Sequence, residues 1–119
     1  MPIDPQDVAA LIPLPPATFH ILLALLDEDR HGYAIIQDVE ARTNGELRMS
    51  AGTLYRSIAR MVEQSLITEV AKRRADDDDP RRRYYRLTPF GNAVARAEMR
   101  RLSDLVRSAR QRGLTPETT

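Results

Sequence analysis

The order in which two kinds of apolar spacing follow one another constrains the fold of this chain more than any other feature. Apolar residues recur at the three- and four-residue spacing of helices in four segments, 17–28, 33–42, 50–64 and 90–112. Between the third and fourth of these segments lie two short runs typical of strands, 66–70 and 84–87. The sequence therefore predicts a mainly α-helical fold with one small β-hairpin.

Local signals predict where three of the helices begin or end. Ser50 is a good N-cap for the third helix because its hydroxyl can accept a backbone N–H of the first turn. Thr88 is predicted to cap the last helix in the same way, with Pro89 at the first helical position, where the missing N–H of proline costs nothing. Asn44 and Gly45 are expected to stop the second helix near residue 42.

The third helical segment is predicted to have one apolar and one polar side. The residues expected to face the core are Leu54, Ile58, Met61 and Val62. The other sides carry Thr53, Arg56, Ser57, Arg60 and Gln64. A hairpin directly after such a helix is the arrangement of a winged helix-turn-helix, whose recognition helix enters the major groove of double-stranded DNA by its N-terminal residues.

Five residues at the start of this helix are the candidates for reading DNA. Ser50, Thr53 and Tyr55 offer compact hydrogen-bonding groups. Gly52 permits a close approach of the backbone, and Arg56 is placed to reach a phosphate or a guanine edge. The alternative is that Ser50 is only a cap and Tyr55 only packs.

Charge is distributed unevenly along the chain. Residues 1–45 carry two basic and seven acidic side chains, whereas residues 46–119 carry sixteen basic and ten acidic ones. The candidates for contacts to phosphate are the cations that flank the hairpin tip, Lys72, Arg73, Arg74, Arg81, Arg82 and Arg83. Four successive carboxylates, Asp76 to Asp79, would repel phosphate at that tip. Chance and solvated helix faces explain the charge balance alone equally well.

The apolar stripe of the last helix is too long for so small a core, so we expect the chain to form a homodimer. The predicted contact residues are Leu22, Leu26, Leu102, Leu105, Val106 and Ala109, which place the last helix against the first helix of the partner. Two-fold symmetry would then separate two recognition helices by roughly 34 Å, which predicts a palindromic, inverted-repeat operator.

Four parts of the chain are expected. Residues 1–16 hold five of the eight prolines and form an irregular arm with at most one helical turn. Residues 17–90 form the winged-helix DNA-binding domain, 91–112 the C-terminal dimerisation helix and 113–119 a flexible tail.

Composition narrows the classes of function. The chain has no cysteine, no apolar run of the roughly 20 residues that a membrane span needs, and no basic, apolar leader, so we expect a soluble, cytoplasmic protein without a membrane partner. His20 and His31 lack the paired spacing of a metal site. Without a phosphate-binding loop or a nucleophile motif, the sequence predicts no cofactor, no metal and no enzymatic activity.

Three stretches resemble the PadR family of transcriptional regulators. They are His31-Gly32-Tyr33-Ala34-Ile35-Ile36, the run from Ser50 to Met61 with its Ser-x-Gly-Thr-Leu-Tyr pattern, and the run from Arg81 to Gly91. The resemblance covers about residues 17–110 in the family's order. It implies a repressor that binds a promoter operator as a dimer and is released by a small-molecule effector.

Two other functions stay open at this point. The chain would then be a winged-helix module for protein interactions or a ligand sensor without DNA binding. An effector held between aromatic rings is not expected, because the chain has no tryptophan and only two phenylalanines. An aliphatic cavity lined by the first and last helices is the remaining place for an effector.

Overall fold

The computed structural model describes residues 2–71 and 82–117, and its elements follow the predicted order. Its helices are α1 (Pro5–Ala9), α2 (Pro16–Ala24), α3 (Gly32–Arg42), α4 (Ala51–Glu63) and α5 (Pro89–Gln111). Its strands are β1 (Arg30–His31), β2 (Ile67–Val70) and β3 (Tyr84–Leu87). The predicted fold class, a winged helix-turn-helix with a long C-terminal helix, is confirmed.

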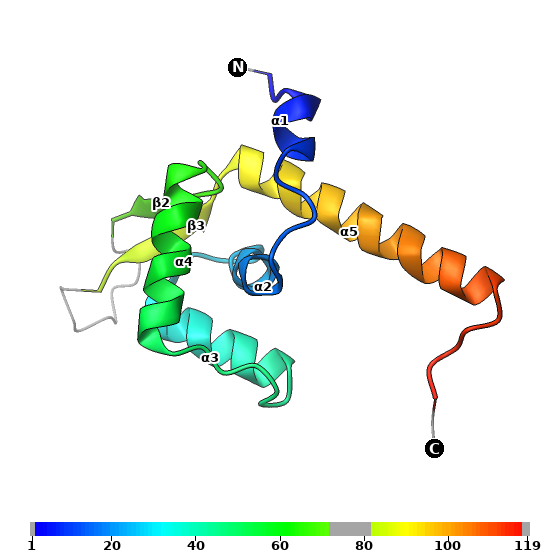
Figure 1. The fold of residues 1–119 in the computed structure, drawn as a ribbon. Coiled ribbons are helices and arrows are strands. Elements are labelled where there is room, and N and C mark those ends of the chain that lie inside the picture. Colours follow the sequence, from blue (N-terminus) through cyan, green and yellow to red (C-terminus); the bar gives the residue numbers. More distant parts are fainter. Residues whose placement is uncertain (1, 72–81, 118–119) are drawn as a thin grey trace.

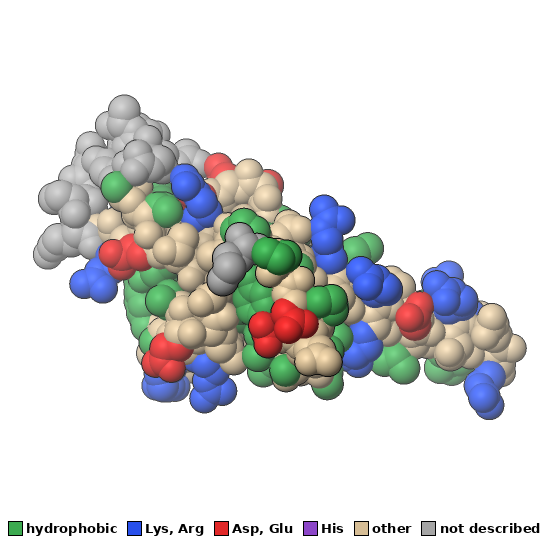
Figure 2. All heavy atoms as spheres, turned by 90° about the horizontal axis from the view of Figure 1, so that it is seen from above, with side chains coloured by type: hydrophobic (Ala, Val, Ile, Leu, Met, Phe, Trp, Pro, Cys, Tyr) green, Lys and Arg blue, Asp and Glu red, His purple; other side chains and the backbone are tan. Residues whose placement is uncertain are grey.

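Helix α2 lies at the centre of the fold, with α3 and α4 on one side and α5 on the other (Figure 1). Each of these four helices contributes an aliphatic side chain without exposed surface, and these are Leu22, Ile35, Leu54 and Val94. The C-terminal half of α5 extends away from this core, and basic side chains follow it to its far end (Figure 2). Within the described residues, no helix is both long and apolar enough to cross a membrane.

The three strands form an antiparallel sheet in the order β1-β3-β2. Strand β3 pairs Leu87 with Ile67 on one side and Tyr85 with Arg30 on the other. The sequence predicted only β2 and β3, because β1 has two residues and is too short to show the alternation of a strand. The wing is therefore joined directly to the residue that precedes α3.

Helix α2 ends four residues before its predicted end at Glu28, and Arg30 explains why. The Arg30 Nε donates a hydrogen bond of 2.7 Å to the carbonyl oxygen of Ala24, the last residue of the helix. The same guanidinium lies within 4 Å of the carboxylates of Asp27, Glu28 and Asp38. This contact depends on a residue positioned by the sheet, so helical spacing alone did not reveal it.

The predicted C-terminal end of α3 and the predicted start of α4 are confirmed. Helix α3 ends at Arg42, and Asn44 and Gly45 take positive φ angles of 52° and 80° just beyond it. The Ser50 Oγ accepts a hydrogen bond of 3.1 Å from the backbone N–H of Thr53 and so caps α4. Sequence signals within a few residues are therefore sufficient to predict these two helix boundaries.

The start of α5 is locked onto the entry to β2. The Thr88 Oγ1 caps α5 by accepting a hydrogen bond of 2.9 Å from the N–H of Gly91, as predicted. The same hydroxyl lies 2.6 Å from the carbonyl oxygen of Ser65 and 3.0 Å from that of Leu66. A Cβ at Gly91 would collide with the Leu66 carbonyl, so only glycine fits.

One predicted core residue of α4 is exposed rather than buried. Leu54, Ile58 and Met61 are buried, but the side chain of Val62 is 43% exposed. The core covers a narrow stripe of α4, and Val62 lies one position beyond it. The prediction for Val62 is therefore wrong.

The N-terminal arm packs on α5 through α1 and is tied to it by a buried carboxylate. Glu98 is 2% exposed, and its two oxygens accept hydrogen bonds of 2.8 Å each from the Arg101 guanidinium. The backbone N–H of Leu14 also donates to this carboxylate. The hydrogen bonds from Arg101 hold the pKa of Glu98 below its usual value, although burial acts the other way.

Candidate nucleic-acid interface

The first turns of α4 carry a chain of polar contacts on their outer side. The Ser50 hydroxyl donates to the Thr53 Oγ1 at 3.1 Å, and the Arg56 Nη2 donates to the same oxygen at 3.4 Å. Ser50 and Arg56 are exposed, whereas Thr53 is partly buried. Three predicted DNA-contact residues thus support one another, which restrains the Arg56 side chain toward the N-terminal end of the helix.

Gly52 places no side chain on the surface of this turn of α4. It is exposed, and a Cβ there would meet only the Arg56 Nη1 at 3.4 Å and the Ser50 Oγ at 4.0 Å. The backbone of the first turn is therefore open to a close approach by a large ligand. Among the described residues, neither Arg56 nor Arg60 forms an ion pair, so both cations are available to an anionic surface.

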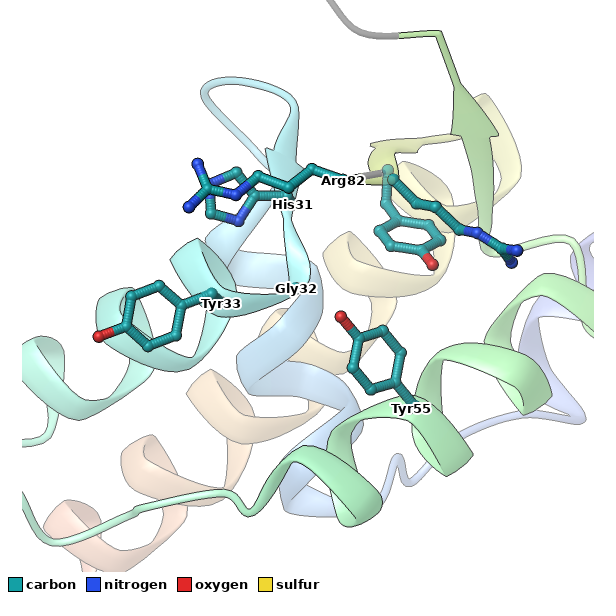
Figure 3. Close-up of a pocket in the computed structure, with 7 residues that line it drawn as sticks. His31, Gly32, Tyr33, Tyr55 and Arg82 are labelled. Atoms are coloured by element: carbon teal, nitrogen blue, oxygen red, sulfur yellow. The ribbon is translucent and has the colours of Figure 1, made fainter. Parts of the chain in front are cut away.

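Tyr55 stands beside the start of α3. Its ring is half exposed, and its hydroxyl lies so near Gly32 that a Cβ there would come within 2.5 Å of the oxygen. Figure 3 shows Tyr55 reaching from α4 toward Gly32, with Arg82 on the wing side of the hollow. This hollow has a volume of about 350 Å³, and Tyr33, Arg83 and Tyr85 complete its wall.

The wall on the wing side is cationic. Arg82 and Arg83 lead directly into β3, and the Arg83 Nη1 lies 3.7 Å from the Glu69 carboxylate across the sheet. Burial raises the pKa of the Tyr85 phenol, and Glu69 raises it further while Arg83 lowers it. The phenol therefore stays protonated at neutral pH, and two guanidinium groups are the charged part of this wall.

The structure brings most of the described candidates onto one side of the molecule. Ser50, Gly52, Thr53 and Arg56 share the start of α4, and Tyr55 shares a hollow with Arg82 and Arg83. The other predicted wing residues, Lys72, Arg73, Arg74, Arg81 and Asp76 to Asp79, lie outside the described residues.

Sequence reasoning did not select Gly32 and Tyr33 as part of this hollow. Both belong to the start of α3, and the approach of Tyr55 depends on how α3 and α4 cross. The signal in the sequence is the run from His31 to Ile36, which carries the resemblance and includes the start of the second helical segment. His31 caps α3 by accepting the N–H of Ala34 at its Nδ1 (3.2 Å), so this histidine has a structural role.

His20 has no metal-site geometry. Its backbone carbonyl accepts a hydrogen bond of 2.9 Å from Arg42 Nη2, and its Nδ1 lies 3.5 Å from Arg42 Nη1. Partial burial lowers the pKa of the imidazole, and the charge of Arg42 lowers it further. No group of three metal-binding side chains occurs in the part of the chain that the structure describes.

The predicted dimer residues divide into two groups. Leu102, Leu105 and Val106 are exposed on α5, by 36%, 56% and 50%, and Leu26 is half exposed beyond the end of α2. Leu22, in contrast, has no exposed surface because α2 is enclosed by the protomer's own core. A side chain without accessible area cannot contact a partner in this conformation, so Leu22 does not belong to a dimer surface.

Comparison with known sequences identifies relatives. Residues 21–97 match the model of the transcriptional regulator PadR-like family. An uncharacterized protein of Lysinibacillus sphaericus is 33% identical over 87 residues, which cover 73% of this chain and 72% of that protein.

Solved structures share the fold. A transcriptional regulator from Clostridium thermocellum superposes with a TM-score of 0.68 at 21% identity, over 96% of this chain and 100% of that one. A PadR family transcription regulator from Clostridium difficile reaches a TM-score of 0.66 at 24% identity, over 79% and 94% of the two chains. A PadR-like transcriptional regulator from Bacillus cereus reaches 0.69 at 18% identity, over 93% and 99%. The family match over residues 21–97, together with this shared fold, shows that the chain belongs to the PadR-like family and is a transcriptional regulator rather than an enzyme.

Proposed function

We propose that this regulator is a repressor that binds a palindromic operator in double-stranded DNA as a homodimer. Helix α4 of each protomer enters the major groove, and the wing lies along the neighbouring backbone. The observation that carries the proposal is the exposed start of α4, where a glycine, two hydroxyl groups and an arginine without a carboxylate partner among the described residues lie together.

Each side chain at the start of α4 has a distinct part in this proposal. Arg56 is suited to a bidentate contact with a guanine edge or to a phosphate, and its bond to Thr53 orders it before DNA arrives. Gly52 lets the helix sit deep in the groove. The Tyr55 hydroxyl, held against Gly32, donates to the DNA backbone from the edge of the hollow.

The wing supplies affinity rather than sequence discrimination. Arg82 and Arg83 line the same hollow as Tyr55, so a sugar-phosphate strand passing over it would meet two cations and a phenol. Neutralising each phosphate releases counterions, which makes this contribution dependent on salt and independent of sequence.

The exposed side of α5 supports the proposed dimer. The buried residues of this helix, Gly91, Val94, Ala95 and Glu98, lie on the side that meets the core. Leu102, Leu105 and Ala109 continue the same side by three- and four-residue steps, but the helix has passed the core there. A second copy that covers this stripe would remove it from water and set two α4 helices on one face of DNA.

Repression would follow from occlusion, because a dimer on a promoter operator competes with polymerase for the same DNA. A small-molecule effector would release it by favouring a dimer whose two α4 helices no longer match the half-site spacing.

The test is fluorescence anisotropy with the DNA upstream of the protein's own gene, across a series of salt concentrations. We expect nanomolar binding that weakens steeply with salt. Thr53→Ala and Arg56→Gln should each weaken operator binding by roughly tenfold, since one good base contact contributes about 1–3 kcal/mol. Arg110→Gln removes an exposed cation from α5 and should leave the affinity unchanged.

Two results would contradict this proposal. Affinity for the upstream DNA equal to that for random DNA would exclude an operator there. Equal losses in Arg56→Gln and Arg110→Gln would show that only net charge matters. If neither DNA binds, a winged-helix module for protein interactions or a ligand sensor becomes the better explanation.

A further inference from the structure

A groove separates the N-terminal arm from α5 on the side that the proposed dimer leaves free. Its volume is about 660 Å³, within the range of small-molecule sites, and its lining is mainly apolar. The arm contributes Ile3, Val8 and Ile12, and α5 contributes Ala93, Ala97 and Arg100. The two alanines follow one another at helical spacing, so their small side chains leave the floor of the groove open.

This groove is distinct from both surfaces used so far. Ala93, Ala97, Arg100 and Asp104 repeat at three- and four-residue spacing on one side of α5, whereas the exposed stripe around Leu105 lies on another. The DNA-facing start of α4 contributes nothing to its lining. A ligand in the groove therefore competes with neither the second copy nor the operator.

The charges at the groove favour one anionic group. The Arg101 guanidinium is already held by Glu98, and the Asp104 Oδ1 is 3.0 Å from the Arg107 Nη1. Arg100 also lines the groove, is exposed, and has neither a hydrogen bond nor an ion pair with another described side chain. One uncompensated cation thus stands at the edge of an apolar groove, and Figure 2 shows basic side chains gathered along this part of α5.

We propose that the groove between α1 and α5 binds an amphipathic monocarboxylate of the fatty-acid class, with the chain between the arm and the two alanines and the carboxylate on Arg100. About two helix turns along α5 separate Ala93 from Arg100, which suits an extended alkyl chain rather than a compact ring. A charge-assisted bond to Arg100 fixes the carboxylate end of the ligand.

The same ligand would stabilise the arm on α5. The arm is held beside the groove by the bond from the Leu14 N–H to Glu98, whose other partner, Arg101, also lines the groove. A bound alkyl chain adds apolar contacts between Val8 or Ile12 of the arm and Ala97 of α5. Binding would therefore fix the N-terminal half of α5, the part to which the winged helix is attached.

Isothermal titration calorimetry of the full chain tests the site without DNA, so its result does not depend on the proposed operator. The probe is decanoate below the concentration at which it forms micelles, with decanol as the uncharged control. We expect one decanoate per protomer and much weaker binding of decanol. Arg100→Gln should weaken decanoate binding by about tenfold or more, as for other charge-assisted bonds, whereas Arg110→Gln should not change it.

A second variant tests the apolar part. Ala97→Leu fills the floor of the groove and should abolish decanoate binding, while circular dichroism and sedimentation confirm an unchanged fold and oligomeric state. Equal binding of decanol, or equal binding by Arg100→Gln and Arg110→Gln, would overturn the assignment. A change of oligomeric state in Ala97→Leu would instead assign the groove to a second copy of the chain and would also overturn it.

Discussion

Gly91 shows how one missing side chain joins two parts of this protein. The start of α5 lies directly on the Leu66 carbonyl, which also accepts a hydrogen bond of 3.1 Å from the Thr88 N–H. The side chain of Leu87 closes the space from the other direction. Because backbone and a packed side chain form this contact, a larger residue at position 91 cannot be accommodated by rotating a flexible group.

We expect Gly91→Ala to lower the free energy of unfolding by about 1–3 kcal/mol, the usual cost of overpacking. Gly52→Ala is the matched control, because its new Cβ meets only the end of Arg56 at 3.4 Å and the Ser50 Oγ at 4.0 Å. That change should leave stability equal or raise it by up to roughly 1 kcal/mol through helix propensity. Urea unfolding followed by circular dichroism measures both, and equal stabilities for the two variants would refute the packing argument.

The Glu98 carboxylate should make stability depend on pH in acid. Its pKa in the folded state lies below the usual value of about 4.5, so the carboxylate stabilises the fold above that value. This contribution disappears as the pH falls through the folded-state pKa. Glu98→Gln should therefore cost about 1 kcal/mol near pH 7 and much less near pH 3, in urea unfolding at both pH values.

Glu63→Gln, an exposed carboxylate on α4, is the control for that experiment and should show no comparable difference. A Glu98→Gln protein as stable as the wild type at pH 7 would mean that the bonds from Arg101 and Leu14 contribute nothing net.

At the scale of elements, the wing is part of a three-stranded sheet rather than a free hairpin. Pairing of β1 with β3 joins the wing to the start of α3, and Arg86 adds two bonds to the Asp29 carboxylate at 2.8 and 3.1 Å. This places Arg82 and Arg83 in a fixed relation to α3 and α4. We therefore expect the cations at the base of the wing to contact DNA without an ordering step of their own.

We expect Arg83→Gln to reduce DNA affinity uniformly across sequences and to lower the slope of log affinity against log salt by about one. Arg86→Gln removes a cation three residues away whose guanidinium is already engaged with Asp29, so it should leave the slope unchanged. Anisotropy titrations on operator and random DNA measure both slopes. An unchanged slope in Arg83→Gln would place this residue away from the phosphates.

How far the sequence predicted these elements depended on the range of the interaction involved. The caps at Ser50 and Thr88 and the stop at Asn44 act within a few residues, and they were predicted. The early end of α2 needed Arg30, which is placed by pairing with a strand more than fifty residues later. Leu22 was misassigned because nearly every side of α2 is apolar, so spacing cannot tell the core from a dimer surface.

At the scale of the whole molecule, we expect the exposed side of α5 to determine the oligomeric state. Leu105→Glu should convert the proposed dimer into a monomer, because a carboxylate would be buried without a partner at the interface. The fold should survive, since the side chain is 56% exposed in the protomer. Sedimentation equilibrium measures the mass, and operator affinity should fall with it.

Leu114→Glu provides the control, because Leu114 is equally apolar, 68% exposed and lies beyond the end of α5. Its mass should equal that of the wild type. If Leu105→Glu keeps the wild-type mass as well, the exposed stripe is not the dimer contact.

The projecting half of α5 also acts as a lever. From Glu98 to Gln111 the helix runs for about 20 Å at its usual rise of about 1.5 Å per residue, with no core beneath it. A tilt of about 5° at its base would therefore displace the far end by about 2 Å. In the proposed two-fold dimer the two displacements would oppose each other. A slight pivot where the arm meets α5 would therefore change the distance between the two α4 helices.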